Sequence, residues 1–348
     1  MTYNNGTRHI SARYDVIRDG VKITQLYAKV PASINMIMDA QLKTYITGTF
    51  ENNDEINLLN DHIRPYLIID GEYFPLGDYV IGVAEMKMTS TGIDMYIEAY
   101  DQSLIASQTR LDTRLSLAAG KLYIDAIKEM LQKCGITMIM ADPNEATLST
   151  VREDWEVGTS YLDIINDLLS EINYKPLFFD EHGIAMLRKN VSPSASNIEF
   201  VYRADEMSIL SADATSVLDI YNAPNVFIVE VSNPDLPAPM RAISTNEDPG
   251  SILSTVRRGR RIVAPLERLD NIASQSALQE YADNKMMQSM LATDTITFET
   301  ALEPGHNVGN VVAIHHPKFS GIYQETEWDI TLAPGSLMRH KARRIVYL

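Results

Sequence analysis

Two stretches near the N-terminus, YDVIRDGVKIT (14–24) and YLIIDGEYF (66–74), decide the fold class. Each stretch has an Asp-Gly pair, Asp19-Gly20 or Asp70-Gly71, between two runs of strand-forming residues. Asp-Gly favours a type I′ turn because both central residues of that turn need a positive φ. The sequence therefore predicts two antiparallel hairpins.

A further strand is predicted after the turn at Gly92. In residues 93–100, Ile and Met alternate with Asp, Tyr and Glu, as a strand with two unlike faces requires. Together with the two hairpins, this pattern predicts a small antiparallel β-barrel or sandwich over residues 1–104.

The pattern changes to helical beyond residue 104. Apolar residues recur at helical spacing from Tyr123 to Cys134, and Gly135 is placed to end that helix in the left-handed conformation. Ser160 can cap a second amphipathic helix that continues to Ile172.

The two helices are followed by PLFFDEHGIAML (176–187), which predicts a short hairpin around Gly183. Residues 105–192 are therefore predicted to form an α+β domain.

The small, polar segment SPSASN (192–197) is the best linker candidate. Residues 193–348 return to a strand pattern and include a helix over about 274–291, so we expect a second β region with a helical insertion. The predicted fold class is a β-rich, multidomain α+β protein.

A weak internal similarity connects the two β regions. Residues 77–81, a turn at Gly92 and IDMYIEAYD (93–101) resemble residues 309–313, a turn at Gly321 and IYQETEWDI (322–330). Two copies of one β module would explain it. Turn chemistry shared by any two hairpins would explain it equally well.

Composition narrows the function classes. The chain has 348 residues, enough for two or three domains, and its 46 acidic and 30 basic residues give a formal charge of −16. General nucleic-acid or anionic-membrane binding is therefore disfavoured. With Cys134 as the single cysteine, no intrachain disulfide is expected. We expect neither a signal peptide nor a membrane span.

The common catalytic signatures are missing. The sequence has no G-x-S-x-G, H-E-x-x-H, G-x-x-x-x-G-K-[ST] or G-x-G-x-x-G motif, so we predict no catalytic residues and no cofactor. His306, His315 and His316, with Glu303 nearby, are the only crowded histidines. Adjacent histidines in a strand point to opposite faces, so no metal site is predicted.

Carboxylates in the last strands were weighed as a glycosidase pair. Glu325, Glu327 and Asp329 alternate, which places them on one strand face, and a solvated face is the expected reading because little around them is apolar. Trp155 between two acidic residues is expected to anchor a loop.

Basic residues are concentrated in two short segments. If these eight residues are set aside, the rest of the chain carries a formal charge of about −24. We expect the segments to be either solvated loops or docking surfaces for an acidic protein partner. The candidate docking residues are Arg257, Arg258, Arg260, Arg261, Arg339, Lys341, Arg343 and Arg344.

The order of these pieces resembles a known family. IRPYLIIDGEYFPLGDYVIG (63–82), IEAYDQSL (97–104), a helix-rich block, GNVVAI (309–314) and GIYQETEWDITLAPGSLMRHKARR (321–344) together resemble the tail-hub proteins of bacteriophages and related contractile injection systems. These are the T4-type baseplate hub and late-control-D proteins. The motifs are patterns of turns and strands that cover most of the chain.

The resemblance implies a structural role. It implies two β-barrel modules per chain and a homotrimer whose six barrels match the sixfold symmetry of a tail tube. It also implies an adaptor in the virion tail or baseplate, assembled in the bacterial cytoplasm. The implied partners are the tube protein, the spike or tail-tip protein and the tape-measure protein, with DNA only in transit and no membrane contact.

Two alternatives stay open at this point. One is a tail-associated cell-wall hydrolase, which would need facing carboxylates or a metal cluster. The other is a receptor- or carbohydrate-binding tail-tip protein, which would favour exposed aromatic residues on loops.

Overall fold

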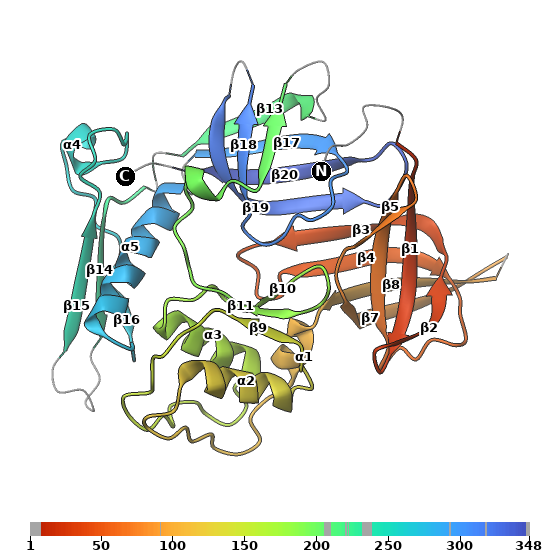
Figure 1. Cartoon of the computed structure of the whole chain (residues 1–348), viewed down its shortest axis with the longest axis horizontal. Coiled ribbons are helices and arrows are strands. Elements are labelled where there is room, and N and C mark those ends of the chain that lie inside the picture. The colour runs from red at the N-terminus through yellow and green to blue at the C-terminus, as the bar shows by residue number, and fades with distance from the viewer. Residues whose placement is uncertain are drawn as a thin grey trace.

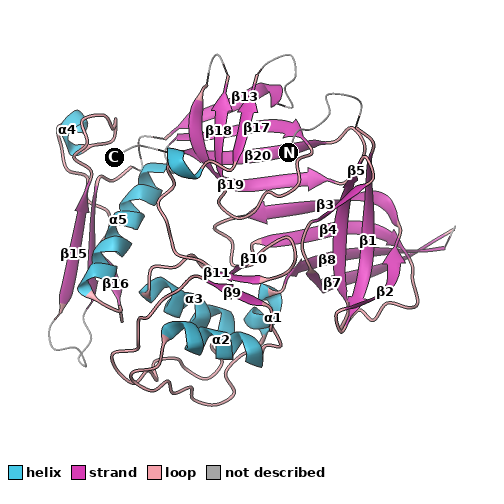
Figure 2. Ribbon diagram, in the orientation of Figure 1, coloured by secondary structure: helices cyan, strands magenta, loops and turns pink. Residues whose placement is uncertain are grey.

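One large sheet contains strands from both ends of the chain (Figures 1 and 2). The computed structural model describes residues 8–90, 92–204, 210–219, 221, 223–231, 239–291, 294–316 and 319–345. The N-terminal strands of the sheet are β1 (Ile10–Arg18), β2 (Val21–Leu26), β3 (Ala28–Ile37), β4 (Thr44–Glu51), β5 (His62–Ile69), β6 (Glu72–Pro75), β7 (Tyr79–Thr89) and β8 (Gly92–Asp101). The C-terminal strands are β12 (Phe200–Arg203), β13 (Leu210–Leu218), β17 (Asp294–Ala301), β18 (Val311–His315), β19 (Gly321–Thr331) and β20 (Leu337–Arg344). We call these two sets the N-terminal and C-terminal modules.

Both predicted hairpins are present. β1 pairs antiparallel with β2, and β5 with β6. The φ angles are 51° and 77° at Asp19 and Gly20, and 51° and 89° at Asp70 and Gly71. Positive φ at both central residues is the type I′ pattern, so the hairpin prediction is confirmed.

The two modules have the same strand order. Without β2 and β6, neighbouring strands run β3-β4-β8-β7-β5-β1 in the N-terminal module and β13-β17-β20-β19-β18-β12 in the C-terminal module. If the strands of each module are counted in chain order, each strand therefore has the same neighbours in both modules. Corresponding pairs are antiparallel except the last, since β12 and β18 are parallel. The path stays open among the described strands, so the predicted closed barrels are not confirmed.

Matching residues show which strands correspond. β7 follows Gly77-Asp78 and β19 begins at Gly321, and in each case a Tyr two residues later, Tyr79 or Tyr323, covers the glycine. A Cβ would lie 2.7 Å from the Tyr79 ring at Gly77 and 2.9 Å from the Tyr323 ring at Gly321. The predicted match of residues 77–81 with 309–313 is therefore wrong by one strand, because turn glycines recur at both places.

The modules meet where β3 pairs antiparallel with the second half of β19. Ile34 lies opposite Ile330, and Met36 lies opposite Trp328. All four side chains are buried in one hydrophobic cluster. The core of the N-terminal module therefore continues into the C-terminal module.

The helical unit lies below the large sheet in Figure 1. Ser160 Oγ accepts a hydrogen bond from the backbone N–H of Asp163 at 3.1 Å, and Gly135 has a φ of 79°. Both predicted helices and the hairpin around Gly183 are confirmed. The elements of this unit are α1 (Ser103–Gln108), α2 (Tyr123–Lys133), β9 (Ile139–Ala141), α3 (Tyr161–Glu171), β10 (Phe178–Phe179) and β11 (Ala185–Leu187).

A third unit interrupts the C-terminal module between β13 and β17. The predicted helix is present, and it buries Leu278, Ala282, Met286 and Met290. Its three strands form a sheet separate from the large one, which the sequence patterns do not predict. The elements of this unit are β14 (Val226–Val231), β15 (Met240–Thr245), α4 (Thr255–Arg258), β16 (Glu267–Leu269) and α5 (Gln275–Leu291). The 3₁₀ turn η1 (Ala195–Asn197) lies earlier in the chain, before β12. Among the described residues, no helix is both long and apolar enough to span a membrane.

A buried ion pair joins the loop before α3 to the helices. Arg152 Nη1 lies 2.6 and 2.7 Å from the two carboxylate oxygens of Glu171, and the Tyr123 hydroxyl donates to the same carboxylate at 2.8 Å. Burial raises the pKa of Glu171 more than Arg152 and Tyr123 lower it. Removing the cation would leave an uncompensated carboxylate in the core.

We predict that Arg152→Met lowers the free energy of unfolding of the helical unit by about 3 to 5 kcal/mol. Hydrogen exchange of the α2 and α3 amides measures this change. The matched control is Arg114→Met, since Arg114 is 70% exposed in its pair with Glu153. That variant is expected to cost less than about 1 kcal/mol. Equal effects of the two variants would contradict the prediction.

Candidate functional site

The first predicted basic segment lies at the end of α4. Gly259 has a φ of 64°, and the chain turns there. Arg257, Arg260 and Arg261 are exposed. Arg258 is half-buried and donates to the carbonyl of Ala223 at 3.0 Å. Three of the four guanidinium groups of this segment are therefore presented to solvent.

The second predicted basic segment is β20. Arg339 lies opposite Asp329 of β19 and Glu299 of β17. Lys341 is paired with Glu327 at 2.6 Å. These contacts pair the cations of β20 with acidic groups of adjacent strands.

The end of β20 is paired in the same way. Arg343 contacts Asp39 at 2.6 Å, and Arg344 contacts Asp294 at 3.3 Å. Figure 1 places α4 in the third unit and β20 in the large sheet, so the two basic segments are on different parts of the fold. The α4 segment therefore exposes three arginines, whereas three of the four cations of β20 form ion pairs with acidic side chains.

Glu325 is the side chain whose position differs most from the expectation. The predicted exposed face of Glu325, Glu327 and Asp329 is wrong for Glu325, which has a fully buried side chain. The pairing of β19 with β20 shifts between Glu325 and Glu327, as a β-bulge does. The bulge reverses which side chains face inward, so Glu325 points into the core while Glu327 and Asp329 remain on the outer face.

Two buried histidines bind the Glu325 carboxylate. His306 Nδ1 lies 2.6 Å from one oxygen, and His340 Nδ1 contacts the other. The opposite ring nitrogens contact hydroxyl groups, with Tyr202 2.6 Å from His306 and Thr300 2.8 Å from His340. We call these five residues the Glu325 network.

The Glu325 carboxylate sets the direction of the two hydrogen bonds that it receives. An ionised carboxylate only accepts, so each Nδ1–H donates to Glu325. The Thr300 hydroxyl donates to the carbonyl of Ala301 at 2.9 Å, so its single hydrogen is not reserved for His340 Nε2. Both Nδ1–H groups point toward one buried negative charge, which makes these charge-assisted bonds.

Two groups of the network, Glu325 and His340, have shifted pKa values. Burial alone would raise the pKa of Glu325, but hydrogen bonds and charge interactions with His306 and His340 lower it to about 2. Burial lowers the pKa of His340 more than the carboxylate raises it. The network is therefore most stable with Glu325 ionised and His340 neutral.

His306, Glu325 and His340 are also a set of residues that could hold a metal ion. The contact between His306 and Glu325, at 2.6 Å, has the length of a hydrogen bond. Two ligands about 2.0 to 2.1 Å from one tetrahedral zinc ion would lie farther apart than this. The geometry therefore fits proton-bridged pairs better than metal coordination.

Only one of the crowded histidines enters this network. His315 is exposed, and His316 stacks on Phe319 with ring centroids 3.7 Å apart. His340 was missed, although Met338, His340 and Ala342 alternate with basic residues, which places His340 on the buried face of its strand. Trp155 is buried, and its Nε1–H donates to Asp167 at 3.1 Å, which confirms the loop-anchor prediction.

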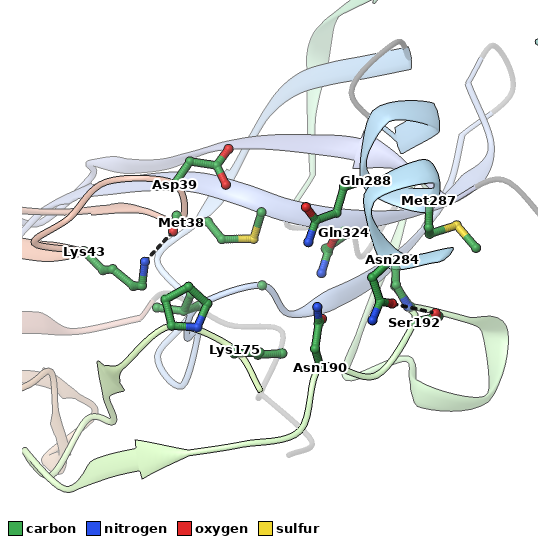
Figure 3. Close-up of a pocket in the computed structure, with 14 residues that line it drawn as sticks. Met38, Asp39, Lys43, Lys175, Asn190, Ser192, Asn284, Met287, Gln288 and Gln324 are labelled. Atoms are coloured by element: carbon green, nitrogen blue, oxygen red, sulfur yellow. Dashed lines mark hydrogen bonds between the residues drawn. The ribbon is translucent and has the colours of Figure 1, made fainter. Parts of the chain in front are cut away.

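A cavity of about 240 Å³ lies where the large sheet, the helical unit and α5 meet (Figure 3). Lys175 Nζ and Gln324 Nε2 lie 3.8 and 3.4 Å from the position of a Cβ on Gly309. Burial lowers the pKa of Lys175. Asn190 and Gln288 add amide groups to the lining. The lining also includes the Asp39 carboxylate, so polar groups of both signs face this cavity.

The fold has relatives among solved structures. A tail protein from Neisseria meningitidis MC58 is 12% identical, with a TM-score of 0.67, over 96% of this chain and 97% of the other. The 43 kDa tail protein of prophage MuSo2 from Shewanella oneidensis is 11% identical, with a TM-score of 0.67, over 96% and 98%. The chain has the fold of phage tail proteins.

The tail-protein fold extends to a secretion component. The E. coli c3393 protein, a type VI secretion component described as similar to the T4 tail proteins gp27 and gp5, is 9% identical, with a TM-score of 0.55. The match covers 95% of this chain and 77% of the other. No protein-family model and no curated protein matches the sequence.

We predict that Glu325→Gln destabilises the tail-protein fold at neutral pH. Because the folded pKa of about 2 is below the ordinary 4.5, Glu325 stabilises the fold fully above about pH 4.5 and loses this effect as the pH falls toward 2. The expected loss in Glu325→Gln at pH 7 is on the order of 3 kcal/mol, and it shrinks in acid.

Urea unfolding of wild type and variant across this pH range measures the difference. Glu327→Gln is the matched control, because Glu327 lies two residues away and is 43% exposed. The control is expected to change stability by less than about 1 kcal/mol. A difference between wild type and Glu325→Gln that stays constant from pH 7 to acid would contradict the assignment.

Proposed function

We propose that this protein is a structural hub of a phage tail or phage-tail-like particle, a non-enzymatic adaptor between the tail tube and the central spike or tail tip. The observation that carries the proposal is the likeness to phage tail proteins, which extends over 96% of the chain. A match of this extent includes both modules and the units between them. The protein would reside in the virion tail or baseplate.

The hub would be a homotrimer. Each chain has two modules of the same strand order, so three chains would present six similar surfaces to a sixfold tube. In the assembled ring the two modules of each chain would take the places of the two β-barrel modules that the sequence resemblance implies. The division into residues 1–104, 105–192 and 193–348 belongs to the same proposal.

Charge distribution supports contacts with tail proteins. The exposed arginines around Gly259 would dock on an acidic surface of the tube, spike, tail-tip or tape-measure protein. The acidic remainder of the chain suits a channel through which DNA passes without binding.

The hydrolase alternative has weaker support. Glycoside hydrolysis needs two carboxylates that face each other across a sugar. Glu327 and Asp329 instead lie opposite Lys341 and Arg339 on the surface of the sheet. Glu325 is fully buried against His306 and His340, where no sugar can reach it.

The location of the protein tests the proposal. Antibody against the chain is expected to label one end of tails in particles purified from the source organism. Purified chain is expected to release no fragments from peptidoglycan. Label absent from tails would contradict the hub function, and peptidoglycan turnover that is lost in Glu327→Gln would favour a hydrolase.

We predict that Arg260→Glu blocks particle assembly without unfolding the protein, because it reverses an exposed charge in the predicted docking segment. Complementation of a particle-producing strain measures assembly. Arg268→Glu is the matched control, since Arg268 is exposed on β16 of the same unit. Normal assembly with Arg260→Glu, or an equal defect in the control, would contradict docking at this segment.

A further inference from the structure

The junction inside the chain provides a template for a contact between chains. At this junction β3 pairs with residues 327–331 of β19. The first half of β19 pairs with β18 along the same edge of β19. β3 is therefore held by β4 on one edge and by the other module on its second edge.

Because the strand order repeats, each of the two strands at the junction has a counterpart in the other module. β13 corresponds to β3, and β7 corresponds to β19. Among the described strands β13 pairs with β17 alone. β7 pairs with β5 only at Tyr79 and Val80, so the strand that pairs with residues 83–88 is β8 alone among the described strands. Within the described part of the chain, residues 83–88 of β7 and 213–218 of β13 therefore each have one edge without a partner strand.

The register of the junction can be transferred residue by residue. The shift before Glu327 in β19 matches the shift before Val83 in β7, so Glu85 corresponds to Asp329 and Met86 to Ile330. Along the paired strands, Val217 corresponds to Asn35 and Leu218 to Met36.

The junction residues and their counterparts on β7 and β13 differ in solvent exposure. Ile330 and Met36 are 3% and 0% exposed at the junction inside the chain. Their counterparts Met86 and Leu218 are 48% and 51% exposed. Val83 and Val217 add further exposed apolar area, at 49% and 54%. At Met86 and Leu218 the free edges thus expose apolar side chains where the junction inside the chain buries them.

We propose that β13 of one copy pairs antiparallel with residues 83–87 of β7 in the next copy, with Glu85 opposite Val217 and Ala84 opposite Leu218. The contact repeats the β3–β19 junction, so the large sheet continues from chain to chain. It rests on the proposed function, since it names the interface of the hub ring. Because β7 and β13 are different surfaces, the contact is heterologous and generates a ring when the rotation closes.

The composition of these edges supports this occupant. Proteins usually protect a free strand edge with charged residues, proline, a bulge or a covering element. Residues 83–88 of β7 carry the charged Glu85 and Lys87 on one face, but Met86 and Met88 lie on the other face, and Met88 is 87% exposed. The hairpin of β7 and β8 projects from the sheet at the right of Figure 1. A second copy that supplies β13 would satisfy both edges at once.

Disulfide trapping tests the pairing. In a Cys134→Ala background, Glu85→Cys with Val217→Cys is expected to give covalent oligomers under mild oxidation at millimolar chain concentration, because directly opposite antiparallel residues have disulfide spacing. Asn35→Cys with Asp329→Cys is the positive control, which should form the corresponding bond within one chain. Glu85→Cys with Ser216→Cys is the register control, since neighbouring strand residues face opposite sides.

A second variant measures the contribution of the apolar edge. Met86→Asp is expected to remove the oligomer in sedimentation velocity runs. Met138→Asp in the helical unit is expected to retain it, and Met138 has nearly the same exposure, at 49%. Far-ultraviolet circular dichroism of both variants checks that the fold is intact.

The outcomes separate this proposal from the hub function. Covalent oligomers from the 85–217 pair, with few from the 85–216 pair, support the strand pairing. Covalent species that are absent while the 35–329 bond forms would overturn it, whatever the oligomeric state. If antibody still labels tails in that case, the hub function survives and the ring uses another surface.

Discussion

The antiparallel contact between β3 and β19 is the constraint on which the rest of the structure depends. It places Ile34 and Met36 against Ile330 and Trp328, and it turns two modules into one sheet. Burial of an aliphatic side chain of this size contributes about 1.5 to 3 kcal/mol, so the junction is a substantial part of the core. A slip of one residue would turn these side chains to solvent, so the register is strongly specified.

The bulge in β19 connects this junction to the Glu325 network. Before the bulge Tyr323 and Glu325 face inward, and after it Trp328 and Ile330 do. Two imidazole N–H groups meet the carboxylate only if Glu325 is the last inward residue before the bulge. An unpaired buried carboxylate is costly, so a shifted bulge would be penalised at both the network and the junction. The network and the core therefore favour the same register.

Local signals in the sequence predict the local elements well. Asp70-Gly71 marks its hairpin because the turn needs two positive φ angles, and Ser160 marks its helix because its hydroxyl caps the first turn. The Glu325 network was not predicted, because strict alternation places Glu325 beside Glu327, and a bulge has no signature in a single strand. The merging of the β regions into one sheet depends on pairing between residues nearly 300 positions apart, such as Ile34 and Ile330, which periodicity cannot reveal.

The central claim is that one chain carries two equivalent modules in a continuous sheet that propagates into a ring. End-on electron-microscopy averages of the assembled oligomer test it most directly. The account predicts a closed ring of three chains in which six similar densities alternate, so the rotational power spectrum has a sixfold component as well as a threefold one. A closed ring with no sixfold component, or an oligomer with twofold symmetry, would contradict the equivalence of the two modules.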